Sequence, residues 1–397
     1  MKIKYKKILL GLVMLCFFIP EGLTVLGSEE VVTNATILNN SVFHTAIKML
    51  YWFRNVMGIC YSAYYILNKT YRIVSNNFKV SITPLDAFAM FAIWMLYTSS
   101  KNGTELYDVA ILLLACFGNI VYMDIEIKKE LYSVIKIEKD VLNILLLINL
   151  LLLLIYPNGI ATGMDYLSTP YHFFGTKNQA TPLFIFASVL YFMSEEYSQN
   201  YIGLVLGQLL VVISVLLYGS GTGVLCVFLN IGLNAFQKRQ KYASQIKRSK
   251  GLKRLLIVSV FLTVGVVFFN IQNLFSFLIV DILGKDITLS GRTEIWRNAI
   301  SAIMKHPFLG HGYGFKVDRG FYSHNLFLEL LVTGGIIGLI LYVVFVEKSV
   351  MHSIKQRTCF MGIMLCGTIS MIACNISEAF IYSFPQLLLC CMMFSMQ

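Results

Sequence analysis

Long apolar runs separated by short polar segments make up most of the chain. Each run is close to the length of about 20 residues that an α-helix needs to cross the hydrocarbon core of a bilayer. We therefore predict an all-α polytopic membrane protein with about twelve transmembrane helices, in which residues 1–397 form a single integral membrane domain. The helices are expected at about 8–27, 43–67, 84–99, 104–123, 140–156, 181–195, 201–217, 222–236, 255–280, 326–346, 358–375 and 380–395.

Positive charge alternates between the loops of this pattern. Three loops rich in Lys and Arg, at 2–7, 124–139 and 237–254, fall on the same side of the predicted bundle. Cytoplasmic loops of membrane proteins carry such an excess. We therefore place both termini in the cytoplasm and expect the first run to be an uncleaved span, because no A-x-A-like cleavage site follows it.

Composition supports a membrane protein and argues against other classes. The chain is 57% hydrophobic and only 13% charged, and its mean hydropathy is +0.70. The net charge of +11 lies mainly beside apolar runs, which indicates orientation and contact with membrane lipid, so we expect no nucleic-acid partner. The nine cysteines lie in or at the edge of apolar runs without metal-ligand spacing, so we predict no disulfide framework, no metal and no cofactor.

The loop 281–324 is the exception to the charge rule. It is predicted to be a large extracytoplasmic loop between helices nine and ten, yet it holds most of the basic residues on that side of the membrane. A negatively charged ligand explains this excess. The loop also belongs to the stretch 290–338, which mixes charge, glycine, histidine and aromatic residues, and we expect the active site there.

Arg292 opens a predicted helix that starts near 291–293 and stops at Pro307, since the residue before proline resists the helical conformation. Apolar residues from Trp296 onwards recur at helical spacing. A helix start offers free N–H groups, and a guanidinium adds a forked donor for phosphate oxygens. The pattern predicts a phosphate or pyrophosphate site at Arg292. Arg297 lies about 140° further round the helix and is a weaker candidate for substrate binding.

A glycine-rich turn and a histidine follow this helix. We interpret the turn, residues 306–314, as a structural return towards the membrane, because no strand precedes its glycines as in a dinucleotide fingerprint. His324 lies between Ser323 and Asn325 at the mouth of the run 326–346. It is the candidate catalytic group for proton transfer or for pairing with an anion, and Asn325 is a candidate substrate contact.

Two other outer segments are candidates to complete a site. The loop 157–180 carries His172 and Lys177–Asn178, of which we predict His172 and Lys177 to contact substrate. The turn between two later helices carries Ser220 and Thr222. The later outer loops contain no pair of carboxylates at a useful spacing, and we expect a metal-independent reaction.

Residues 290–345 contain an ordered set of motifs: S-G-R-x-x-x-W, then H-P-x-x-G-x-G-x-G, then S-H-N-x-x-L-E-L-L-x-x-x-G-x-x-G. This order resembles the O-antigen polymerase and O-antigen ligase superfamily of bacterial envelope enzymes, which includes the Wzy-type polysaccharide polymerases. The matching residues are Gly291, Arg292, Trp296, His306, Pro307, Gly310, Gly312, Gly314, His324, Asn325, Glu329, Leu330, Leu331, Gly335 and Gly338.

The resemblance implies a GT-C-like membrane glycosyltransferase in the bacterial cytoplasmic membrane. Its donor would be an oligosaccharide on undecaprenyl pyrophosphate at the outer face. The resemblance assigns Arg292 to the pyrophosphate leaving group and His324 to the acceptor hydroxyl or the lipid-linked substrate, without a metal. Many relatives carry a further arginine where this chain has Gly221, so Lys177 or Arg297 is the candidate to replace it.

We predict a polymerase of capsular, exo- or O-antigen repeat units, with flippase and chain-length regulator proteins as partners. A ligase that transfers the finished glycan to another acceptor is the alternative on the same scaffold. A flippase of the lipid-linked unit is the alternative from another class. It requires ionisable residues along a path through several spans, and the only Lys or Arg residues within the predicted spans are Lys48 and Arg54. A non-catalytic assembly scaffold would leave Arg292 and His324 dispensable.

Overall fold

The computed structural model describes most of the chain and leaves out its most basic part. It covers residues 2–26, 30–38, 41–75, 81–103, 106–164, 168–239, 292–317, 321–356 and 360–396, with a few isolated positions besides. The predicted helix at 255–280, most of the basic loop 237–254 and the first part of the loop 281–324 lie outside the described residues.

Helices form most of the described structure, and many begin and end close to the predicted runs. They are α1 (Lys2–Phe17), α2 (Glu21–Thr24), α3 (Ser41–Ser75), α4 (Pro84–Lys101), α5 (Leu106–Ile155), α6 (Thr181–Ser198), α7 (Tyr201–Leu217), α8 (Gly221–Arg239), α10 (Arg292–Lys305), α11 (Leu326–Gln356), α12 (Met361–Asn375) and α13 (Phe384–Ser395), with a 3-10 turn at Thr36–Leu38. Local chemistry explains some of these boundaries. Thr83 accepts a hydrogen bond from the N–H of Asp86, whose carboxylate accepts one from the N–H of Thr83, which is a capping box before α4.

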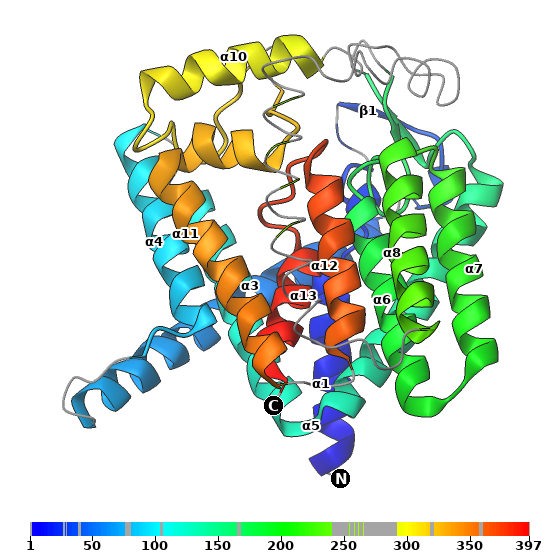
Figure 1. Ribbon diagram of the computed structural model, residues 1–397. Coiled ribbons are helices and arrows are strands. Elements are labelled where there is room, and N and C mark those ends of the chain that lie inside the picture. Colours follow the sequence, from blue (N-terminus) through cyan, green and yellow to red (C-terminus); the bar gives the residue numbers. More distant parts are fainter. Residues whose placement is uncertain are drawn as a thin grey trace.

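Most of the long helices run alongside one another, whereas part of α3 extends away from them, and both chain ends lie at one end of the bundle (Figure 1). Helix α10 and strand β1 (Val31–Thr33) lie at the opposite end. One large apolar cluster forms the core and includes nearly all of α13 and most of α6. The arrangement separates the predicted cytoplasmic termini from the segment 290–338, as the charge pattern requires.

Several described helices have the composition of membrane spans. Within the described residues, Leu326–Lys355 is the helix that is both long enough and apolar enough to cross a bilayer. Shorter apolar helices occur at Lys7–Phe17, Tyr201–Leu217, Gly221–Gln237, Met361–Asn375 and Phe384–Ser395. These helices are consistent with a polytopic membrane protein, while the number of twelve spans stays a prediction.

The first predicted helix is shorter than expected. Helix α1 ends at Phe17 rather than near Gly27. Pro20 follows, and proline has no N–H to continue a helical hydrogen-bond ladder. Helix α2 is therefore a separate short turn, and its Glu21 becomes available to line a cavity described below.

The predicted loop 124–139 is also wrong, because α5 continues through it as a helix. The backbone departs from helical geometry at Glu130, with φ −158° and ψ 80°, so two helical segments meet at a kink there. The charged residues that suggested a loop support the helix instead. Lys128 pairs with Asp124 one turn earlier at 2.7 Å.

A small antiparallel sheet corrects the all-α prediction. Strands β1, β2 (Ala161–Gly163) and β3 (Pro170–Tyr171) pair in the order β1-β2-β3, with Val32 opposite Thr162. The segments are too short to show a period of two in the sequence. Their pairing joins two loops that lie far apart along the chain, so only tertiary structure creates it.

Helix α11 is interrupted where the glycine-rich turn contacts it. At Gly335 the backbone has φ 62° and ψ −168°, which is a region that favours glycine. The carbonyls of Val332 and Thr333 accept hydrogen bonds from the N–H groups of His311 and Gly312, at 2.7 and 2.9 Å. The turn therefore satisfies backbone groups that the interruption exposes, and it fixes the segment that leads to His324.

Candidate active site

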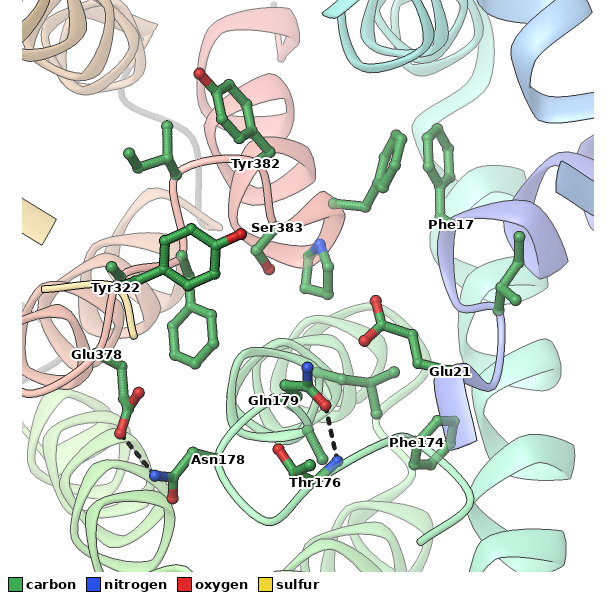
Figure 2. A pocket seen from close by; sticks show the side chains of 18 of the residues that line it. Phe17, Glu21, Phe174, Thr176, Asn178, Gln179, Tyr322, Glu378, Tyr382 and Ser383 are labelled. Atoms are coloured by element: carbon green, nitrogen blue, oxygen red, sulfur yellow. Dashed lines mark hydrogen bonds between the residues drawn. The ribbon is translucent and has the colours of Figure 1, made fainter. Parts of the chain in front are cut away.

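A cavity of about 530 Å³, lined by both apolar and polar residues, lies among segments from distant parts of the chain. Its lining comes from the end of α1 and from α2, from α3, from the loop before α6, from the segment that precedes α11, and from the turn between α12 and α13. Figure 2 shows the carboxylates of Glu21 and Glu378 pointing into it from different walls. Such a cavity, with few polar groups among aromatic side chains, is a candidate substrate site.

Glu378 is the centre of a polar cluster on one wall. It lies in the turn between α12 and α13, and its side chain is only 7% exposed. Its Oε1 accepts hydrogen bonds from Arg292 Nη2 at 2.5 Å and from Asn178 Nδ2 at 2.6 Å, and its Oε2 lies 3.3 Å from His324 Nδ1. Three partners that are distant in sequence thus converge on one buried carboxylate.

His324 faces Glu378 because its neighbours fix the backbone. Its φ is 49°, which is uncommon for a residue other than glycine. On one side, Ser323 donates to the Glu329 carboxylate through both its N–H and its hydroxyl. On the other side, Asn325 Oδ1 accepts from the N–H groups that begin α11. The imidazole is 32% exposed and lines the cavity, so one ring nitrogen pairs with Glu378 while the ring stays accessible.

Arg292 reaches the cluster from the start of α10. This helix packs on α11 through a small apolar group that includes Trp296 and Leu328. Trp296 Nε1 also donates to the carbonyl of Ser323 at 2.9 Å, so one side chain ties α10 to the His324 segment. Arg292 is not among the described residues that line the cavity. Its placement supports a role in holding Glu378.

Asn178 connects the cluster to the turn before α8. Its Oδ1 accepts a hydrogen bond from Ser220 Oγ at 3.1 Å, and Ser220 Oγ in turn accepts one from the N–H of Gly223. Thr222 lies 3.2 Å from the hydroxyl of Ser377, next to Glu378. The predicted candidates Ser220 and Thr222 therefore support the site from behind the carboxylate.

The other sequence candidates lie elsewhere. His172 is buried against the ring of Tyr218, and burial lowers the pKa of its imidazole, which favours the neutral form. Lys177 and Arg297 are exposed and are not among the described lining residues. Asn325 is 1% exposed and caps α11, which is a structural reason for its position.

Sequence reasoning missed Glu378, although a signal was present. It is the one charged residue after Arg357, and it lies between two apolar runs. A lone ionisable residue in such a place is a functional candidate by default. Arg54 and Glu21 were also missed as site residues, because both fall within apolar runs and only the fold turns them towards the cavity.

The fold and the site together indicate a class of protein. The protein is a helical membrane-type chain with a polar cavity, on which a carboxylate, a histidine and an arginine converge. Residues 206–343 match the O-antigen ligase family. This match confirms the predicted resemblance to the O-antigen polymerase and ligase superfamily, and both Arg292 and His324 lie inside it.

Two curated proteins share shorter stretches with the chain. The chain is 35% identical over 97 residues to the exopolysaccharide production protein ExoQ of Rhizobium meliloti, covering 20% of this chain and 22% of that protein. It is 40% identical over 75 residues to an O-antigen ligase of Pseudomonas aeruginosa, covering 17% of this chain and 19% of that protein. The matched part thus spans about a fifth of each relative. No solved structure matches the chain.

Proposed function

We propose that the protein is a glycosyltransferase that polymerises undecaprenyl-pyrophosphate-linked oligosaccharide units into capsular, exo- or O-antigen polysaccharide. The observation that supports this most is the pairing of His324 with the buried Glu378 on the wall of the cavity. A carboxylate beside one ring nitrogen of a histidine prepares the other nitrogen to act as a base.

The transfer step follows from this pairing. With its Nδ1–H donated to Glu378 Oε2, His324 keeps a free lone pair on Nε2. The acceptor hydroxyl oxygen attacks the anomeric carbon of the donor sugar and gives its proton to Nε2. The bond between the anomeric carbon and the phosphate oxygen breaks, and the lipid pyrophosphate leaves with the electron pair. Glu378 stabilises the imidazolium that forms, and Arg292 keeps Glu378 in place.

A second cavity supports a lipid-linked substrate. It has a volume of about 290 Å³, lies between α11, α12 and α13, and has a mainly apolar lining that also includes Glu347, Thr368, Asn375 and Gln386. It begins at Leu326 and Phe327, directly after the His324 segment, and continues past Leu389. A polyprenyl chain of the donor is the occupant that we propose for it, because Leu326 and Phe327 follow the His324 segment directly and place apolar lining near the polar cluster.

A genetic test addresses this proposal. A strain that lacks the gene is complemented with wild type, Arg292→Ala or His324→Ala, and the polysaccharide is resolved by length. Both variants should insert at wild-type levels and yield single, unextended repeat units. Arg297→Ala is the matched control, because this arginine lies on the same helix but is exposed. Full-length polymer from both site variants would contradict the proposal.

The same strain separates the alternatives. A polymerase defect leaves single repeat units on the outer face of the membrane. A ligase defect leaves full-length polymer on the lipid carrier, without transfer to a final acceptor. A flippase defect keeps single units on the cytoplasmic face. The position and length of the accumulated glycan therefore identify the class.

A further inference from the structure

Arg54 lines the same cavity as Glu378 and has no role in the transfer step described above. It lies in the first half of α3, near the middle of the predicted span 43–67. We propose that Arg54 binds a phosphate oxygen of the lipid pyrophosphate in this cavity. This inference rests on the proposed function for its substrate, and it names the residue that holds the leaving group.

The guanidinium of Arg54 is held in a fixed position by aromatic rings. Its central carbon lies 4.5 Å from the ring centroid of Tyr51 and 5.1 Å from that of Phe384. The backbone carbonyl of Arg54 accepts a hydrogen bond from Asn119 Nδ2 at 2.9 Å, which joins α3 to α5. An arginine stacked in this way loses little conformational freedom when it binds a ligand.

One nitrogen of this guanidinium has no partner in the part of the chain that the structure describes. Arg54 Nε is buried without a hydrogen bond, and no ion pair joins the side chain to another described residue. Leaving a charged donor unsatisfied in a buried place is unfavourable. A ligand with acceptor oxygens in the cavity would accept a hydrogen bond from this donor and remove the free-energy cost.

The charges of the cavity favour Arg54 over Arg292 as the anion contact. Arg292 is already paired with Glu378, whereas Arg54 is the one Lys or Arg among the described lining residues. Glu21 also lines the cavity. Burial raises the pKa of its carboxyl, against a smaller opposing effect of Arg54, so burial favours the neutral form of Glu21.

Arg54 also differs in position from the basic residues predicted to contact substrate. Lys177 and Arg297 are exposed and are not among the described lining residues. Arg54 is distant from His324 and Glu378 in sequence, but the fold brings it to the same cavity. His324 and Arg54 then have separate roles in the transfer. His324 takes the proton, and Arg54 stabilises the negative charge that develops on the leaving oxygen.

Two oxyanions share the chemistry that Arg54 recognises: the phosphate of the carrier lipid and the carboxylate of an acidic sugar. The test therefore uses one probe for each. Purified full-length protein in nanodiscs is titrated by calorimetry with geranyl pyrophosphate, a short isoprenoid pyrophosphate, and in parallel with glucuronic acid. Arg54→Gln should weaken binding of geranyl pyrophosphate at least tenfold, and the exposed-site control Arg297→Gln should change it less than twofold.

A measurement on the wild-type protein gives a test that does not depend on the folding of a variant. Phenylglyoxal reacts with accessible arginines, and mass spectrometry reads the extent at each site. Geranyl pyrophosphate should slow modification of Arg54 at least fivefold, and glucuronic acid should not. Equal modification with and without geranyl pyrophosphate, or protection by glucuronic acid alone, overturns the assignment.

The two proposals fail in different ways. His324→Ala should retain affinity for geranyl pyrophosphate while it loses transfer, because the proton acceptor and the anion contact are separate groups. If the gene deletion leaves polysaccharide length unchanged, the proposed function is wrong, yet protection of Arg54 by geranyl pyrophosphate still establishes the anion site. If transfer depends on His324 while Arg54 is not protected, only the Arg54 assignment is lost.

Discussion

Replacing Glu378 by glutamine tests the carboxylate–histidine pair with little change of shape. The glutamine Oε1 can still accept hydrogen bonds from Arg292 and Asn178, as Glu378 Oε1 does. The amide NH₂ then takes the place of Oε2, which faces His324 Nδ1 at 3.3 Å. Because an amide nitrogen only donates, it favours the tautomer in which Nδ1 accepts and Nε2 carries the proton.

The expected loss follows from this change of tautomer. A protonated Nε2 cannot accept the proton of the acceptor hydroxyl, and general-base catalysis contributes roughly 10²–10⁴-fold to a rate. This corresponds to about 3–5 kcal/mol in the activation free energy. The stability loss should be smaller, about 1–3 kcal/mol, because one charged partner of Arg292 becomes neutral while its hydrogen bond remains.

The assay measures chain extension with a purified lipid-linked repeat unit and the protein in nanodiscs. Glu378→Gln should lower the rate by at least a hundredfold while the protein keeps its elution profile and its affinity for geranyl pyrophosphate. Glu294→Gln is the matched control, because Glu294 is exposed on α10. A rate within threefold of wild type for intact Glu378→Gln would refute the proposed base.

Three further predictions concern the framework of the site. Gly335→Ala should lower the melting temperature, since its φ is 62° and a Cβ would lie 2.2 Å from the carbonyl oxygen of Phe308, whereas Gly232→Ala, in open space, should not. Trp296→Phe loses the bond to Ser323 O and should cost about 1 kcal/mol in unfolding and reduce transfer. Burial lowers the pKa of His172, so the unfolded state binds more protons and stability falls as pH drops below the ordinary value of 6.5. His172→Gln should make thermal unfolding less dependent on pH between 8 and 5.

Most of the described helices and one part of the site could be predicted from the sequence. Apolar length indicated α6, α7, α8, α12 and α13, because a helix that meets lipid or a helical core must be apolar over most of its surface. Proline and spacing located α10, and the polar run after it identified His324. The loop at 124–139 was predicted wrongly, because lysines that pair with acids one turn away fit a helix as well as a loop.

The polar residues that share a cavity could not be predicted from the sequence, because they meet through tertiary packing. Arg54, Asn178, His324 and Glu378 come from four segments separated by tens to hundreds of residues. Sequence spacing relates side chains only along one helix or strand, whereas helix packing sets their meeting across segments. The three short strands depend on tertiary structure for the same reason. The chain encodes a set of helices with a few polar residues, and their packing makes those residues a candidate active site.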